Sequence, residues 1–280
     1  MMKIGLTRAG LGDIGSDERF IELAAAYGFE TVDADAVGLV QKHGVDGAKE
    51  LLAKHGVSLS SIGLPAEWRT TDDAFRAGLG KLRDAAEAAA ALGCTSCCTY
   101  ILPSTDQPAA RFMALAVRRL RICAQLLGAY GIRLGLEYVG PHHLRTRWAN
   151  PYIWTQQETL ELIDAIGEPN AGLLLDSYHW YTTEMSADDI ASLKPHQIVH
   201  VHLNDAKPVP VSEALDNDRL YPGEGVIDLG AFLKALHATG YDGAVTQEIL
   251  TQSPPTDSAE TLLERSKAGF AKAFAAAGLR

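Results

Sequence analysis

The chain has 280 residues, of which 47% are hydrophobic and 21% charged, and its formal net charge at pH 7 is −10. This composition is ordinary for a globular protein with a substantial core. The negative charge argues against nucleic acid as a partner, because phosphate binding needs clustered Lys and Arg. The first residues run straight into a predicted strand without an export signal, and no apolar run is long enough to span a bilayer. We therefore expect a cytoplasmic protein with no membrane partner.

Short strand-like runs alternate with longer helical stretches along the chain. The predicted strands are residues 3–6, 31–35, 59–64, 96–101, 133–138, 172–176, 197–204 and 244–248. The predicted helices are residues 17–27, 45–55, 72–92, 109–130, 157–166, 187–193, 229–239 and 258–277. Glycines that end helices precede most of the strands, as is typical of a helix C-terminus.

Repeated strand–helix units predict parallel strands joined by helical crossovers. Eight such units predict closure into a (β/α)8 TIM barrel, with residues 1–280 as a single domain. An open, doubly wound sheet is the alternative, but no G-x-G-x-x-G sequence follows the first strand. No linker, charge block or low-complexity tract divides the chain.

Four cysteines, Cys94, Cys97, Cys98 and Cys123, are too few and too clustered for a disulfide framework. The C-x-x-C spacing of Cys94 and Cys97 fits redox chemistry or half of a zinc site. The sequence holds no second C-x-x-C pair, and residues 96–100 are typical of a buried strand. We therefore interpret these thiols as packing residues.

The ends of the last four predicted strands carry polar side chains, and barrels of this type place their active sites at strand ends. Alternation along residues 133–138 puts Glu137 on the inward face, and the same parity turns His202 and Glu248 inward. Asp176 ends an apolar run in the sixth strand. Any one such carboxylate is more often a helix cap or a salt-bridge partner. Three in one mouth would repel one another unless they were protonated or bound a cation.

Three carboxylates and one imidazole suit a single divalent ion. We expect Mn²⁺ first, with Mg²⁺, Co²⁺ or Zn²⁺ as alternatives. The predicted ligands are Glu137, Asp176, His202 and Glu248.

Several stretches closely resemble the sugar phosphate isomerase/epimerase superfamily, the xylose isomerase-like TIM barrels. They are GLEYVG at 135–140, GLLLDSYH at 172–179, VHVHLND at 199–205, DRLYPGEG at 218–225 and TQE at 246–248. The Asp-Arg element and the LDSYH string are most similar to inosose isomerase-like proteins. The resemblance is strong over the C-terminal half and mainly topological over the N-terminal half. It implies the same four metal ligands, and it implies that His179 and Arg219 contact the substrate.

The sequence departs from the ketose 3-epimerases of that superfamily after the seventh strand. Residues 204–208 read NDAKP where those enzymes usually carry Gly-Glu-type residues and a nearby Arg. The loop at 141–148 is also longer and distinctive. The inosose isomerase-like proteins are therefore the nearest group, and the substrate stays open.

The resemblance implies proton transfer next to the carbonyl of a keto-sugar or keto-cyclitol, through a metal-bound enediolate. This would make the protein an isomerase or epimerase of carbohydrate metabolism, with inositol catabolism as the nearest setting. Glu137 and Glu248 are the natural acid–base pair, since each carboxylate can keep one oxygen for the metal and offer the other to substrate. His179 would steady or protonate a substrate oxygen. His200 is first interpreted as an interior hydrogen-bond partner and second as a substrate contact, and Trp148 could pack on a sugar ring.

Other functions fit the same pattern. A metal-dependent dehydratase or lyase acting on a keto-inositol or a 3-keto-glycoside would use the same metal and base. Endonuclease IV-like barrels share the architecture, but they use more His ligands and a basic face. A non-catalytic sugar-binding barrel is the remaining alternative. The expected partner is thus a small carbohydrate or cyclitol, and the oligomeric state is left open, with a homo-oligomer among the options.

Overall fold

Eight parallel strands close into a barrel in the order β1-β12-β9-β8-β6-β4-β3-β2 in the computed structural model, which describes residues 2–279. The barrel strands are β1 (Lys3–Leu6), β2 (Thr31–Asp33), β3 (Ser58–Gly63), β4 (Ser96–Ile101), β6 (Arg133–Tyr138), β8 (Ala171–Asp176), β9 (Ile198–Leu203) and β12 (Ala244–Gln247). Strands that follow one another along the chain are neighbours in the barrel. The predicted TIM barrel is therefore confirmed.

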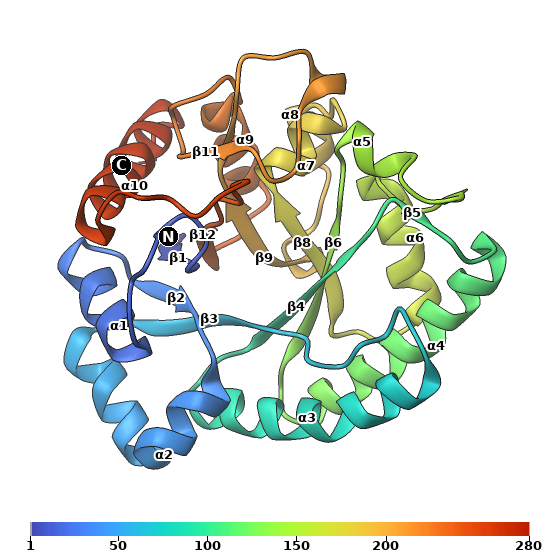
Figure 1. The fold of residues 1–280 in the computed structure, drawn as a ribbon, viewed down its shortest axis with the longest axis horizontal. Coiled ribbons are helices and arrows are strands. Elements are labelled where there is room, and N and C mark those ends of the chain that lie inside the picture. Colours follow the sequence, from blue (N-terminus) through green and yellow to red (C-terminus); the bar gives the residue numbers. More distant parts are fainter. Residues whose placement is uncertain (1, 280) are drawn as a thin grey trace.

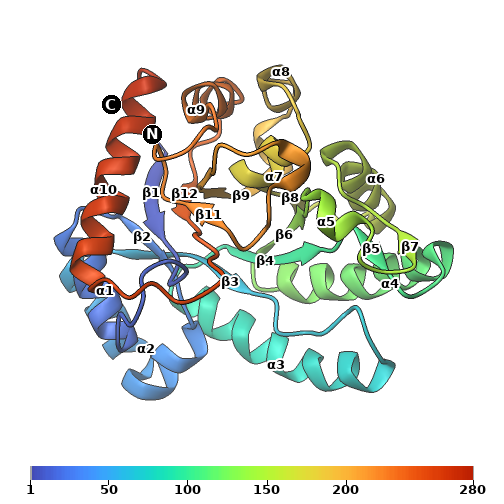
Figure 2. The same cartoon turned by 45° about the horizontal axis from the view of Figure 1, so that its top comes forward.

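Eight helices of the described chain form an outer ring around these strands (Figures 1 and 2). They are α1 (Asp17–Ala26), α2 (Ala36–His55), α3 (Asp72–Ala91), α4 (Ala109–Gly128), α6 (Gln156–Ile166), α8 (Ala187–Ala191), α9 (Leu229–Ala238) and α10 (Ala259–Ala276), while the short helices α5 (His142–Arg145) and α7 (Ser177–Thr182) lie in the segments after β6 and β8. None of the helices within residues 2–279 combines the length and the apolar character that a bilayer span requires.

Helix α2 differs from the sequence-based prediction of a helix at 45–55. It begins at Ala36, where the side chain of Asp35 caps it by accepting the N–H of Val37. Gly44 interrupts it with φ 69° and ψ 169°, so the predicted helix is only the second half of α2. Assigning Asp35 to the second strand was therefore wrong, because its carboxylate is used as a helix cap.

Two short antiparallel pairs lie outside the barrel sheet. β5 (Ser104–Thr105) pairs with β7 (Asn150–Pro151), and β10 (Asp205–Ala206) pairs with β11 (Arg219–Leu220). The second pair follows β9 directly and ties the segment that carries Arg219 to the carboxyl end of the barrel.

The barrel strands bury both faces. Outward residues such as Leu134 and Leu136 are fully buried beneath the helices. Inside, Gly5 on β1 leaves room for its neighbours, because a Cβ there would lie 2.2 Å from Oγ1 of Thr31 and 2.9 Å from Oγ1 of Thr246. The barrel interior beside Gly5 is thus filled by the side chains of Thr31 and Thr246 from the adjacent strands.

The cysteines are all free thiols, and three of them are buried. Burial raises the pKa of Cys94 to about 11 and the pKa values of Cys98 and Cys123 to about 12. Such thiols stay protonated and unreactive at neutral pH. These observations support their interpretation as packing residues.

Asp205 on β10 organises the loop that follows β11. Its buried carboxylate accepts the backbone N–H groups of Gly223, Gly225 and Ile227 at 2.9–3.0 Å. Gly225 passes so close to β10 that a Cβ there would lie 2.1 Å from the carbonyl oxygen of Ala206. The Gly-Glu-Gly segment therefore shapes a loop, and the N–H groups of both of its glycines are already occupied by a carboxylate.

We expect Asp205→Ala to lower the free energy of unfolding by about 2–3 kcal/mol, the scale for losing charged hydrogen bonds and stranding buried donors. Asp228→Ala is the matched control, because Asp228 accepts one N–H at the exposed start of α9 and such a cap is worth about 1 kcal/mol. Urea unfolding of both variants measures the difference. Equal losses would contradict the organising role of Asp205.

Candidate metal centre and active site

Four predicted ligands meet at the carboxyl end of the barrel. They come from four neighbouring strands: Glu137 on β6, Asp176 at the end of β8, His202 on β9 and Glu248 directly after β12. Strand register explains the convergence, since Asp176 on β8 and Thr246 on β12 both pair with His202. One ligand atom from each residue lies within 4.8 Å of every other. The geometry expected from strand parity is therefore present.

The distances centre on Nδ1 of His202. This atom lies 3.5 Å from Oε1 of Glu137, 3.4 Å from Oε2 of Glu248 and 3.9 Å from Oδ2 of Asp176. Nδ1 of His202 and Oε1 of Glu137 are buried and have no hydrogen-bond partner. Buried polar atoms without a partner are rare in native proteins unless an ion or a water satisfies them. The donor set and its two orphaned atoms fit a divalent cation.

Asp176 is the most firmly held of the four. It is fully buried, and its Oδ1 accepts the N–H of Tyr178 at 2.6 Å and that of His179 at 3.3 Å, so it also caps α7. The side-chain amide of Asn204 donates to both of its oxygens, at 3.2 and 2.9 Å. These hydrogen bonds fix the orientation of the Asp176 carboxylate.

Arg219 supplies positive charge to the cluster. Its Nη1 donates to Oδ2 of Asp176 and to Oε2 of Glu248, both at 2.9 Å, while its Nη2 donates to Oδ1 of Asp216 at 2.8 Å. The side chain is almost completely buried. The structure thus places Arg219 against two of the predicted ligands, and its contact with substrate stays a prediction. Asp216, which stands three residues before Arg219, was not among the predicted site residues.

The charges shift the pKa values of the cluster. Burial raises the pKa of Glu137 above its ordinary value. Burial also disfavours ionised Glu248, but the charges of His202 and Arg219 outweigh it and lower its pKa. Burial disfavours the charged imidazole of His202, yet Glu248, Asp33 and Glu137 raise its pKa well above the ordinary value. The cluster therefore attracts one positive charge, which a proton supplies when no ion is bound.

His179 lies beside the four ligands rather than among them. Its Nδ1 accepts the N–H of Gly140 at 3.3 Å. Its Nε2 lies 3.4 Å from Nη2 of Arg219 and 3.9 Å from Oδ1 of Asp216. The ring orientation is therefore fixed next to Arg219, and the substrate role of His179 remains a prediction.

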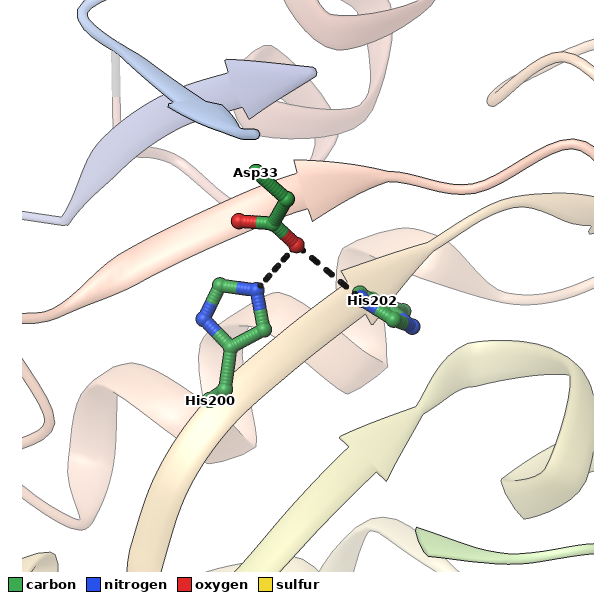
Figure 3. Close-up of side chains that lie close together, drawn as sticks. All are labelled: Asp33, His200 and His202. Carbon is green, nitrogen blue, oxygen red and sulfur yellow. Dashed lines mark hydrogen bonds and ion pairs between the residues drawn. The ribbon is translucent and has the colours of Figure 1, made fainter. Parts of the chain in front are cut away.

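Asp33, at the end of β2, contacts the site although it was not among the predicted site residues. Its Oδ2 lies 3.0 Å from Nε2 of His200 and 3.5 Å from Nε2 of His202 (Figure 3). The hydroxyl of Ser60 donates to its Oδ1 at 2.7 Å. His200 is thus an interior hydrogen-bond partner, as first interpreted. The available signal was a carboxylate near the carboxyl end of the predicted strand at 31–35, a feature similar to the one that identified the predicted ligands.

Two adjoining cavities lead to this cluster. The first, of about 230 Å³, is lined by Glu137, His202 and Glu248 but not by the fully buried Asp176. The second, of about 670 Å³, shares four lining residues with the first and reaches α2 and α3. The shared residues are Asp33, Ser61, Ile62 and Gly63.

Trp148 lies in the loop after α5. The guanidinium carbon of the preceding residue, Arg147, lies 5.1 Å from the centroid of the Trp148 ring. The backbone N–H of Trp148 donates to Oγ of Ser104 at 3.3 Å. Among the described residues, Trp148 does not line either cavity beside the cluster. Its stacking on a sugar ring remains a prediction.

A family model described as a xylose isomerase-like TIM barrel matches residues 21–269. The chain belongs to this family. Inosose isomerase of Halalkalibacterium halodurans is 28% identical over 144 residues, which are 51% of this chain and 49% of that protein. The chain therefore spans about half the length of the inosose isomerases that it matches.

Solved structures agree with the fold. A xylose isomerase domain protein from Alicyclobacillus acidocaldarius has a TM-score of 0.92 at 34% identity, over 99% of this chain and 100% of that one. The IOLI protein, solved with a binding zinc atom, has a TM-score of 0.80 at 19% identity, over 97% of this chain and 98% of that one. At that low identity, the second similarity shows the fold alone.

We expect the purified protein to bind about one divalent ion per chain, to lose it to chelator, and to release about one proton on binding at pH 7. The proton comes from His202, whose raised pKa favours the charged imidazole before the ion binds. Affinity should therefore fall as the pH falls. Elemental analysis and calorimetry in buffers of different ionisation enthalpy measure both quantities. Binding without proton release would contradict this description of the cluster.

Two histidine variants separate metal binding from the rest of the site. His202→Ala should lose the ion, because the only nitrogen ligand disappears and the carboxylates are less well compensated. His179→Ala should keep the ion and lose turnover or substrate affinity. Metal content and turnover are measured for both. Equal loss of metal would show that His179 belongs to the metal centre.

Proposed function

We propose that the protein is a divalent-metal-dependent isomerase or epimerase of a keto-sugar or keto-cyclitol. One observation carries the proposal: Glu137 and Glu248 line the same small cavity, whereas Asp176 is fully buried and does not line it. Two carboxylates facing one bound substrate can remove a proton at one position and return it at another. The matched inosose isomerases, by their name, act on a keto-cyclitol, which supports this substrate class.

Glu137, Asp176, His202 and Glu248 would hold the ion. When bound, a divalent ion polarises a carbonyl oxygen and stabilises the negative charge that develops there. The IOLI protein, which has the same fold, was solved with a binding zinc atom, and this supports a divalent ion as the bound group. We retain Mn²⁺ as the first expectation, and metal reconstitution with Mn²⁺, Mg²⁺, Co²⁺ and Zn²⁺ decides among them.

The chain's own residues then move the proton. One of the two carboxylates takes the proton from the carbon next to the carbonyl. The C–H electron pair forms a C=C bond, and the carbonyl π pair moves onto the oxygen, which gives an enediolate. In epimerisation a proton returns to the same carbon from the opposite face. In isomerisation it returns to the former carbonyl carbon, while the proton of the adjoining hydroxyl passes to the former carbonyl oxygen, so that the adjoining oxygen becomes the new carbonyl. We expect His179 and Arg219, which lie 3.4 Å apart, to steady substrate oxygens.

A second candidate function is elimination from a 3-keto-glycoside or a keto-inositol. The larger cavity beyond Asp33 and Gly63 favours it, because a further group on the substrate would have space there. The same base would remove the proton, and the electron pair would expel a β-hydroxyl or β-glycosyl group. An enone or 1,2-diketone chromophore in the product distinguishes elimination from isomerisation.

The experiment is a screen of keto-inositols, ketohexoses and 3-keto-glucosides with Mn²⁺ in deuterium oxide. Wild-type protein should exchange a substrate proton next to the carbonyl for deuterium, as followed by NMR. Glu137→Gln and Glu248→Gln should each lower kcat by about 10²–10⁴-fold at saturating Mn²⁺, the usual scale for a lost general acid or base.

The control is Glu161→Gln on the outer helix α6, where the carboxylate is exposed. This variant should turn over like wild type. If both cavity variants kept wild-type exchange and turnover, the two-carboxylate mechanism would be refuted, and His179 would be the next candidate base.

A further inference from the structure

We infer that Asp33 is a positioning residue, whose carboxylate holds the imidazole of His202 with Nδ1 directed at the ligand cluster. The inference rests on the proposed metal binding and concerns a residue from the opposite half of the chain. Asp33 stands on β2, and 167 residues separate it from its hydrogen-bond partner His200 on β9. Two strands, β1 and β12, lie between β2 and β9 in the barrel, so the contact crosses the interior.

The two carboxylate oxygens of Asp33 have different partners. Oδ1 accepts the hydroxyl of Ser60, which fixes the plane of the carboxylate from the neighbouring strand β3. Oδ2 lies between two imidazole rings, 3.0 Å from Nε2 of His200 and 3.5 Å from Nε2 of His202 (Figure 3). The two rings stand at 83° to one another, with centroids 5.2 Å apart. One oxygen thus faces one nitrogen from each ring.

This arrangement decides which nitrogen of His202 can bind an ion. A neutral imidazole carries one N–H and one lone pair, and the partner of the N–H sets the tautomer. When Asp33 accepts the N–H at Nε2, the lone pair is at Nδ1, the buried atom without a hydrogen-bond partner. In the opposite tautomer, Nδ1–H would point at Glu137 and Glu248, 3.5 and 3.4 Å away, and would compete with the ion.

His200 forms a hydrogen bond with the same carboxylate of Asp33. Its side chain is only 1% exposed, and its contact with Asp33 is a hydrogen bond within the barrel interior. A carboxylate that orients a ligating histidine also raises the basicity of the ligand, and removing such a partner typically costs about 10–100-fold in metal affinity. Asp33 therefore acts on the ion through His202 rather than by direct contact.

The same three residues could instead hold an ion themselves, since Asp33, His200 and His202 form the second potential ligand group among residues 2–279. His202 would then have to bind two ions, one through each ring nitrogen. The hydrogen bonds from Ser60 and His200 already occupy the oxygens of Asp33 without an ion. We therefore favour a positioning role for Asp33. The number of metal ions bound per chain distinguishes this role from direct ligation by Asp33.

The test compares Asp33→Asn with Thr31→Val. Thr31 lies two residues earlier on the same strand, and its buried hydroxyl has no hydrogen-bond partner, so the second variant perturbs the interior without breaking a contact. Dissociation constants for Zn²⁺ and Mn²⁺ are measured at one pH by competition with a chelating dye. Asp33→Asn should weaken both by about 10–100-fold. Thr31→Val should match wild type, and urea unfolding of the metal-free proteins corrects for differences in folding.

A second measurement needs no variant. In wild-type protein loaded with Zn²⁺ and labelled with ¹⁵N-histidine, His202 should show a protonated Nε2 and a metal-bound Nδ1. Protonation at Nδ1 with Nε2 bound to the ion would overturn the inference, even if Asp33→Asn failed to fold.

Two further results would overturn the positioning role. One is an affinity of Asp33→Asn equal to that of wild type. The other is a second equivalent of Zn²⁺ in wild type that Asp33→Asn lacks, which would make Asp33 a ligand. Failure of the proposed function is distinguishable, because a protein that binds metal in the predicted way but acts on no keto-substrate would refute only the reaction.

Discussion

Three carboxylates held in one barrel mouth repel one another, and the rest of the site is arranged around that repulsion. Arg219 lies against two of them, and His202 faces all three. In a buried environment such charges are costly unless opposite charge and hydrogen bonds compensate them. The pKa of His202 is raised for this reason, since its neighbours favour a positive charge at the centre. A divalent ion meets the same requirement more fully than a proton does.

The compensation of the carboxylate charges depends on segments that contribute no metal ligand. β10 and β11 tie the stretch around Arg219 to the end of β9, and Asp205 holds the following loop by accepting backbone N–H groups. Asp176 joins two functions, because its carboxylate both caps α7 and faces the ligand cluster. The start of α7 places His179 beside Arg219. The geometry of the mouth is therefore set by loops and caps as much as by the strands.

The two halves of the barrel contribute differently. The last four barrel strands supply the four predicted ligands, and this is the half where the resemblance to xylose isomerase-like barrels is strongest. The first half supplies cavity walls, among them Ser61 and Gly63, and the carboxylate of Asp33 behind His202. Walls that contact the remote parts of a substrate are free to vary while the metal chemistry stays the same. The predicted ligands of the second half therefore point to a reaction class, whereas the cavity walls of the first half do not point to one substrate.

The sequence by itself determined the barrel, the approximate strand ends and the inward direction of Glu137 and His202. These properties follow from local periodicity, since alternation along a strand assigns each side chain to a face. The role of Asp33, the ion pairs of Arg219 and the start of α2 were decided only by the tertiary structure. Asp33 meets His200 across 167 residues of chain, and Arg219 meets Asp176 across 43. Periodicity carries no information about such partners, because closure of the barrel and the course of its loops bring them together.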